Sequence, residues 1–118
     1  MWSLTRWIPM QRGGVVAVAA SGDYGKPRPA IVVQTDASSD GHASVIVCRL
    51  TSALAEAAEF RVTIKPDAEN GLGAISQVMA DKSVTIGRTR VGQHIGWLQW
   101  GDMVKLNAAP AFVMGLAD

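Results

Sequence analysis

Two short, nearly continuous apolar runs constrain the fold of this chain more than any other feature of its sequence. They are residues 30–34, Ala-Ile-Val-Val-Gln, and residues 44–50, Ser-Val-Ile-Val-Cys-Arg-Leu. Both are rich in β-branched side chains and too short for typical helices, so they predict strands that are buried on both faces. Residues 15–20 form a similar run, residues 60–65 alternate between apolar and polar side chains, and residues 75–86 have extended character. The chain is therefore expected to consist mainly of β-strands.

The segments between these strands are too short for the helical crossovers of a parallel sheet, so an antiparallel arrangement is expected. Residues 51–58 predict a brief helix, and residues 102–114 predict a C-terminal helix with Asp102 as its N-cap. The apolar stripe of that helix consists of Met103, Leu106 and Val113. Pro110 predicts a kink or a break near residue 109. The predicted fold is mainly β, a small antiparallel barrel with a short inserted helix and a C-terminal helix.

Composition narrows the classes of function. The 118 residues suffice for one domain, expected at 10–118, with residues 1–9 as an N-terminal extension. A formal charge of +1 excludes a uniformly basic coat, so a polyanion would have to bind a local cluster of cations. One cysteine and two histidines predict no disulfide, metal site or cofactor. No apolar run has bilayer length and no signal peptide is recognisable, so a cytoplasmic protein without membrane contact is expected.

Arg28 lies between two prolines just before the first of the two apolar runs. Pro27 fixes its own φ angle and Pro29 keeps Arg28 extended, so a stiff backbone carries the guanidinium. Lys26 tends to project from the same side, because side chains alternate along an extended chain. Two cations beside the glycine-containing segment 22–25 suit a phosphodiester, since Arg offers a planar fork and Lys a point charge. The alternative is that these residues only begin an edge strand, with both charges exposed to solvent.

Thr51 and Ser52 follow the second apolar run, where a hydroxyl can be aimed at a phosphate or a ribose. The alternative is that one of them caps the short helix predicted after them. Asp81, Lys82 and Ser83 interrupt an apolar extended stretch, and a solvated strand face is the alternative to a binding role.

The remaining candidates for chemistry are weaker. His42 and His94 could form a general acid–base pair, but nothing in their spacing links them. Cys48 is expected to be a small core residue rather than a nucleophile. Trp97 and Trp100 could stack on bases, although both are expected instead to anchor the last strand and helix.

Several short motifs follow one another along the chain. In order they are Gln11-Arg12-Gly13, Gly25-Lys26-Pro27-Arg28-Pro29-Ala30-Ile31-Val32-Val33, Val45-Ile46-Val47 leading to Leu50-Thr51-Ser52, Glu69-Asn70-Gly71-Leu72, Ser76-Gln77-Val78-Met79-Ala80-Asp81-Lys82 and Arg90-Val91-Gly92-Gln93-His94-Ile95-Gly96. Together, over residues 10–118, they resemble the MazF/PemK family of toxin–antitoxin ribonucleases.

This resemblance implies an SH3-like barrel of the CcdB/MazF type that works as a homodimer and is held in check by a cognate antitoxin. It also implies a metal-independent, sequence-specific endoribonuclease without a cofactor. In such an enzyme the ribose 2′-hydroxyl of single-stranded RNA attacks phosphorus, and the products are a 2′,3′-cyclic phosphate and a 5′-hydroxyl.

The family's catalytic residues fall on Arg28 and Thr51 of this chain. Because a guanidinium stays protonated in proteins, Arg28 is expected to stabilise the phosphorane oxygens and to donate a proton to the leaving oxygen, while Thr51 fixes the phosphate. Asp23 is a candidate for the general base. The RNA-binding residues expected from the resemblance are Asp23, Tyr24, Lys26, Ser52 and Lys82.

Two other functions stay open on this fold. One is a non-enzymatic, CcdB-like gyrase poison, and the other is a degenerate member that binds only RNA or antitoxin; the retained Arg28 and Thr51 favour the ribonuclease. The sequence departs from the family where Gly14 replaces a frequent aspartate and where Lys82 and Val84 replace a frequent glutamine and arginine. The preferred RNA sequence is therefore expected to differ from that of relatives.

Overall fold

The computed structural model describes residues 11–19, 26–35, 44–55 and 60–109, so the expected extension at residues 1–9 lies outside it. The elements within these ranges are β1 (Gly14–Val18), β2 (Arg28–Thr35), β3 (Ser44–Thr51), β4 (Arg61–Ile64), β5 (Ser76–Gly87), the 3-10 turn η2 (Arg88–Arg90), β6 (Val91–Trp97) and α2 (Trp100–Asn107). All five strands expected from the sequence are present, and β6 completes the sheet.

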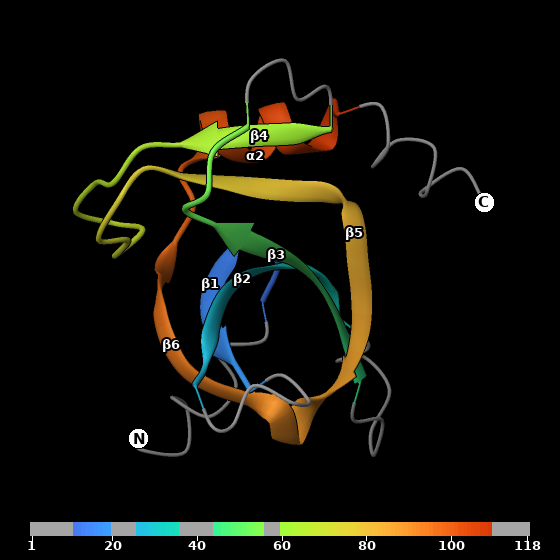
Figure 1. The fold of residues 1–118 in the computed structure, drawn as a ribbon. Helices are drawn as coiled ribbons and strands as arrows, with labels where there is room; N and C mark the ends of the chain where they lie inside the picture. The colour runs from blue at the N-terminus through green and yellow to red at the C-terminus, as the bar shows by residue number, and fades with distance from the viewer. Residues whose placement is uncertain (1–10, 20–25, 36–43, 56–59, 110–118) are drawn as a thin grey trace.

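The six strands form one antiparallel sheet in the order β4-β5-β3-β2-β1-β6. Figure 1 shows this sheet curled into a ring, with β6 and β5 on opposite sides of β1, β2 and β3. Register shifts in the β1–β6, β2–β3 and β3–β5 ladders accompany this curvature, as bulges increase the bend of a strand. The predicted antiparallel fold is confirmed, but within the described ranges no ladder joins β4 to β6, so the barrel is open.

The central strands β2 and β3 are buried on both faces, as their continuous apolarity predicts. Alternate residues of each strand point to opposite faces and enter two separate cores. The helix-side core contains Val15, Ile31, Val33, Cys48, Leu50, Val62, Ile64, Val78, Ala80, Leu98, Met103, Leu106 and Ala109. The second core contains Val16, Val18, Ala30, Val32, Val45, Val47 and Ile86. The second core forms the sheet face on which the candidate site lies.

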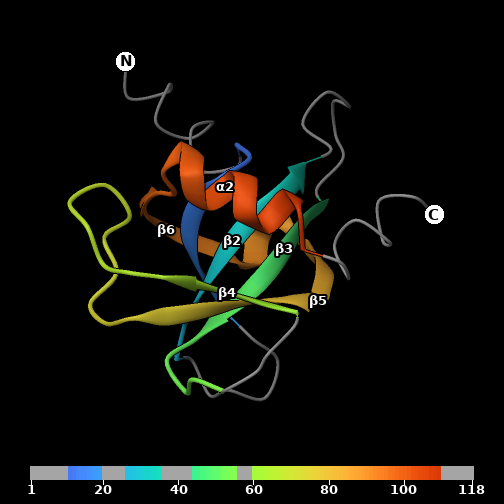
Figure 2. The same cartoon turned by 90° about the horizontal axis from the view of Figure 1, so that it is seen from above.

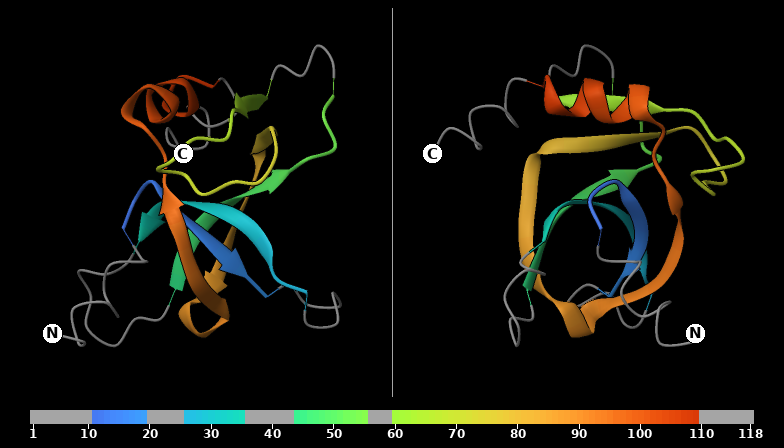
Figure 3. Two further views of the ribbon diagram at one scale, coloured as in Figure 1. Left: turned by 90° about the vertical axis from the view of Figure 1, so that its left-hand side faces the viewer. Right: turned by 180° about the vertical axis from the view of Figure 1, so that it is seen from behind.

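The helix α2 covers the opposite end of the ring from η2 (Figures 1 to 3). It buries Met103 and Leu106, as predicted, but it begins at Trp100, and its N-cap is Gln99 without a side-chain hydrogen bond. The prediction that Asp102 caps the helix is therefore wrong, since Asp102 lies inside the first turn, where a carboxylate interacts favourably with the helix dipole. The helix ends at Asn107, which agrees with a break near residue 109 ahead of Pro110; Val113 lies outside the described ranges.

Residues 51–55, the first part of the inserted helix predicted over 51–58, are not helical. The backbone N–H of Ala53 donates to Thr51 Oγ1 at 3.0 Å, and that of Ala55 donates to Gln77 Oε1 at 3.0 Å. These two bonds satisfy the segment's backbone locally and against β5, which replaces the i to i+4 pattern of a helix. Residues 56–59 lie outside the described ranges.

The first family motif fastens the N-terminal segment to the sheet and the helix. Arg12 donates from Nη1 to Val33 O and from Nη2 to Asn107 Oδ1. Gly13 has a positive φ of 89°, donates its N–H to Val32 O at 2.8 Å and accepts from Leu98 N at 2.9 Å. Gly14, the departure from the family's frequent aspartate, is buried at the start of β1.

The Glu69-Asn70-Gly71 motif forms a turn that packs directly on β6. Asn70 is fully buried; its Nδ2 donates to Lys65 O at 2.8 Å, and its Oδ1 accepts from Leu72 N at 3.0 Å. Gly71 has a φ of 68°, and Glu69 O accepts from Trp97 N at 2.8 Å. A Cβ on Gly96 would lie 2.3 Å from Glu69 O, so this turn requires glycine in β6.

Replacing Gly96 with alanine is expected to destabilise the protein by roughly 3 kcal/mol, because the clash is with backbone and neither strand nor turn can yield locally. Urea denaturation measures the free energy of unfolding. The control is Gly101→Ala in α2, where an added Cβ has no described atom within 4 Å and alanine is the better helix former, so the unfolding free energy should stay equal or rise. Equal stability of Gly96→Ala and the wild type would contradict this packing.

Candidate functional site

The pairing of β2 with β3 brings Arg28 and Thr51 to the same end of the sheet. The ladder pairs Ala30 with Arg49, Ile31 with Cys48 and Val32 with Val47; Arg28 begins β2 two residues before Ala30, and Thr51 ends β3 two residues after Arg49. Alternate residues of a strand point to the same face, so Arg28 shares the face of Ala30 and Thr51 shares that of Arg49. Arg49 lies on that face too, two residues from Thr51, so two guanidiniums and a hydroxyl occupy one sheet end.

Strand geometry positions Arg28 at the edge of the second core. It is the first residue of β2, it is exposed, and it pairs with Val18 of β1 while Pro29 pairs with Ala17. Proline at the beginning of a strand is compatible with this pairing and restricts the backbone on either side of Arg28. The side chain therefore starts from a backbone that both neighbouring strands hold.

Thr51 is oriented by the bend that follows it. Its Oγ1 accepts from Ala53 N, and Ala53 O in turn accepts from Arg61 Nη1 at 3.1 Å. Gln77, which pairs with Thr51 on β5 and is buried, binds both Ala55 N and Ala55 O, at 3.0 and 3.3 Å. Because the hydroxyl oxygen accepts from the backbone, its O–H is left to act as a donor toward a ligand.

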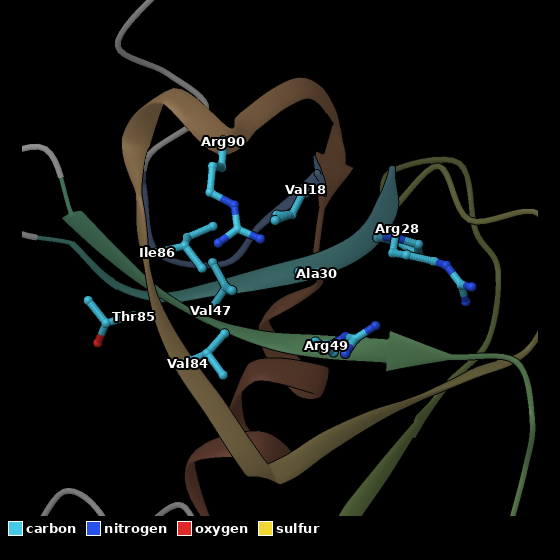
Figure 4. A pocket seen from close by; sticks show the side chains of 10 residues that line it. Val18, Arg28, Ala30, Val47, Arg49, Val84, Thr85, Ile86 and Arg90 are labelled. Carbon is cyan, nitrogen blue, oxygen red and sulfur yellow. The ribbon is translucent and has the colours of Figure 1, made fainter. Parts of the chain in front are cut away.

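A pocket of about 290 Å³ opens beside Arg28 on the second core (Figure 4). Its residues are Val18, Arg28, Pro29, Ala30, Val47, Arg49, Val84, Thr85, Ile86 and Arg90. Three of them are arginines, and no carboxylate lines it among the residues that the structure describes. The Arg90 side chain points in over Val18, Val47 and Ile86, whereas that of Thr85 points away. The pocket combines an apolar floor with positively charged walls, which suits part of a polyanion.

Sequence reasoning missed Arg49 and Arg90. Arg49 had a usable signal, because it interrupts an apolar run two residues before Thr51 and must share its face. Arg90 begins a family motif, but its place in the pocket depends on a contact across 71 residues: Nε donates to Ala19 O at 2.8 Å, and Ala19 N donates to Arg90 O at 3.0 Å.

Three of the other predicted binding residues lie near this site without lining the pocket. Lys26 is exposed two residues before β2, and Ser52 is exposed directly after Thr51. Lys82 is exposed on β5 in the register gap across from Arg49, because Ser83 pairs with Cys48 and Val78 with Leu50. Asp23 and Tyr24 lie outside the described ranges.

The remaining candidate groups serve the framework. Burial and the nearby Asp81 raise the pKa of Cys48 to about 11, so the prediction of an unreactive core thiol is confirmed. The His94 ring packs on Trp97 with centroids 4.7 Å apart, and burial lowers its pKa; His42 is not described. Trp97 is half-buried in β6, but Trp100 is 82% exposed, so the prediction that Trp100 anchors the helix is wrong.

Across the described ranges, no three histidine, cysteine or carboxylate side chains gather as metal ligands would. The same ranges contain no helix with the length and apolarity needed to cross a bilayer.

Comparisons with known proteins agree with this architecture. Residues 11–113 match the family described as PemK-like, MazF-like toxin of type II toxin–antitoxin system. A probable endoribonuclease MazF of Mycolicibacterium smegmatis is 37% identical over 109 residues, which cover 92% of this chain and 99% of that protein. A mycobacterial endoribonuclease solved with its cognate antitoxin is 28% identical with a TM-score of 0.69, covering 89% of this chain and 94% of its own. A MazE–MazF structure from Deinococcus radiodurans, 21% identical with a TM-score of 0.68 over 89% and 95% of the two chains, shares the fold. The chain belongs to the PemK-like, MazF-like toxins of type II toxin–antitoxin systems.

Proposed function

We propose that this chain is the toxin that cleaves single-stranded RNA, as a sequence-specific and metal-independent endoribonuclease with Arg28 and Thr51 as catalytic residues. The observation that carries the proposal is the β2–β3 register, which brings Arg28, a lining residue of the cationic pocket, and Thr51 to the same end of the sheet. The names of two relatives, a probable endoribonuclease and an endoribonuclease bound to its cognate antitoxin, support it. We extend the proposal to a cytoplasmic homodimer that a cognate antitoxin inhibits.

The reaction in this proposal needs neither an enzyme nucleophile nor an external reactant. The ribose 2′-oxygen attacks the adjacent phosphorus and gives up its proton, the bond between phosphorus and O5′ breaks, and O5′ takes up a proton. The products are a 2′,3′-cyclic phosphate and a 5′-hydroxyl. Negative charge grows on the non-bridging oxygens during the attack, so donors already in place around them lower the barrier.

Each residue of the cluster has a definite task. The planar Arg28 guanidinium donates hydrogen bonds to the non-bridging oxygens and a proton to the leaving O5′. The Thr51 hydroxyl donates a hydrogen bond to the same phosphate. Arg49, on the same face of the sheet, binds a neighbouring phosphate. Further contacts along the RNA come from Lys26, Ser52, Lys82 and Tyr24. Asp23, three residues before Lys26, is the proposed acceptor of the 2′-hydroxyl proton.

Arg28→Ala and Thr51→Ala are each expected to slow cleavage of a long single-stranded RNA by at least about 100-fold, the usual cost of losing a donor to the transition state. Thr51→Ser, which keeps the hydroxyl, should retain most of the rate. Lys105→Ala on α2 removes one positive charge away from the pocket and should leave the rate unchanged. The rates are measured in excess EDTA by following fragments with 5′-hydroxyl ends.

Cleavage that chelator abolishes, or equal cleavage by wild type and Arg28→Ala, would overturn the proposed mechanism. Folded wild-type protein that leaves RNA intact and causes gyrase-dependent DNA breaks would support the poison instead. Binding of RNA or antitoxin without either activity would identify a degenerate member.

Arg49→Ala is expected to weaken the salt dependence of RNA binding. If Arg49 neutralises one phosphate, the slope of log K against log salt concentration becomes shallower by about 0.7, the value for one contact to a single strand. The measurement uses a 2′-O-methyl oligonucleotide, which lacks the attacking hydroxyl, titrated at four salt concentrations. Lys105→Ala should keep the wild-type slope, and an unchanged slope in Arg49→Ala would show that Arg49 contacts no phosphate.

A further inference from the structure

Arg90 is fixed differently from the two other arginines of the pocket. It ends the η2 turn, and two hydrogen bonds join it to Ala19: its own Nε donates to Ala19 O, and its carbonyl accepts from Ala19 N. The bond from Nε leaves the guanidinium edge formed by Nη1 and Nη2 turned into the pocket, as Figure 4 shows. A planar donor pair is thus held in place before any ligand arrives.

The surface below Arg90 is apolar and rigid. Val18, Ala30, Val47 and Ile86 are between 1 and 8% exposed and belong to the second core, while Val84 is 42% exposed and lines the same pocket. A phosphate set on this floor would bury its charge against apolar side chains, which is costly. A nucleobase suits it, since a base has flat apolar faces and polar groups only along its edges.

We propose that this end of the pocket is a base-reading subsite in which Arg90 recognises a nucleobase that carries two adjacent hydrogen-bond acceptors on one edge. The proposal rests on the proposed RNA-cleaving function and names the specificity residue of that site. The base lies on the apolar floor next to the phosphate held by Arg28 and Thr51, and Arg90 donates to its edge from Nη1 and Nη2.

The donor pair selects among the four bases by chemistry alone. Guanine offers adjacent acceptors at O6 and N7, and cytosine offers them at O2 and N3. Adenine and uracil have no two adjacent acceptors: adenine N1 and N7 lie beside the N6 amino group, and both uracil carbonyls lie beside N3–H, so one Arg90 N–H would face another N–H there. The subsite is therefore expected to favour guanine or cytosine over adenine and uracil, by about fivefold or more per bidentate contact.

The test compares the bases found beside cleavage sites. A random single-stranded RNA pool is digested in EDTA by wild type and by Arg90→Gln, and the 5′-hydroxyl ends are sequenced. We expect guanine or cytosine to be enriched at one position beside the cut by wild type, and that enrichment to disappear in Arg90→Gln while the preferences at other positions remain. Whether guanine or cytosine is enriched identifies the edge that Arg90 reads.

Two further variants separate this role from a structural one. Val84→Phe narrows the pocket from an exposed position and should reduce the same enrichment without lowering the melting temperature. Arg88→Lys, in the same η2 turn but outside the pocket lining, is the matched control and should keep the wild-type pattern. If Arg90→Gln has a lower melting temperature than wild type, the base enrichment measured with Val84→Phe decides whether the subsite reads a base.

A second readout does not depend on cleavage. Selection of a random 2′-O-methyl RNA pool by binding should show the same preference, with Arg90→Gln losing it while keeping the wild-type salt slope. A salt slope shallower by about 0.7 with unchanged base preference would make Arg90 a phosphate contact and overturn the proposal. Unchanged preference in both Arg90→Gln and Val84→Phe would overturn it as well. If the wild type binds RNA with this base preference but does not cleave it, the proposed nuclease activity is refuted and the base-reading subsite is not.

Discussion

The antiparallel register between β2 and β3 is the constraint on which the rest of this molecule depends. A shift by one residue would turn every side chain of one strand to the other face, and both strands are buried on both faces. Two separate cores therefore fix the register, and the register fixes which residues meet at the strand ends. Arg28 and Thr51 meet at one end of the sheet because of the apolar residues that follow one and precede the other.

The motifs shared with the toxin family divide into framework and site. Gln11-Arg12-Gly13 fastens the N-terminal segment to β2 and α2, through Arg12 to Val33 and Asn107, and Glu69-Asn70-Gly71 packs on the edge strand β6, through Glu69 to Trp97. Arg28 and Arg90 belong to motifs that line the pocket, together with Arg49, which lies outside the motifs. The rigid frame thus gathers three guanidiniums around one pocket, where they attract an anionic ligand.

Most strands of the fold and part of the candidate site were predictable from the sequence, and each wrong or missing prediction has a physical cause. Short β-branched runs and the period of residues 60–65 predict the strands correctly, since these signals are local. The helix expected over 51–58 fails in residues 51–55 because Gln77, 22 residues beyond Ala55, supplies the backbone partners there. Trp100 was expected to be an anchor, but α2 begins at this residue and turns its side chain outward. Arg90 escaped prediction because only tertiary pairing with Ala19 brings it to the pocket.

The proposed mechanism has Arg28 and Thr51 act on one phosphodiester because the sheet brings both to one end of β2 and β3. A double-mutant cycle tests it most directly: the cleavage rates of wild type, Arg28→Ala, Thr51→Ala and the double variant are measured on one RNA. Two groups acting on the same phosphate should be coupled, so the double variant should lose far less than the product of the single losses, with an interaction energy on the order of 1–3 kcal/mol. Single losses that simply multiply would show that the two residues act independently and would contradict the account.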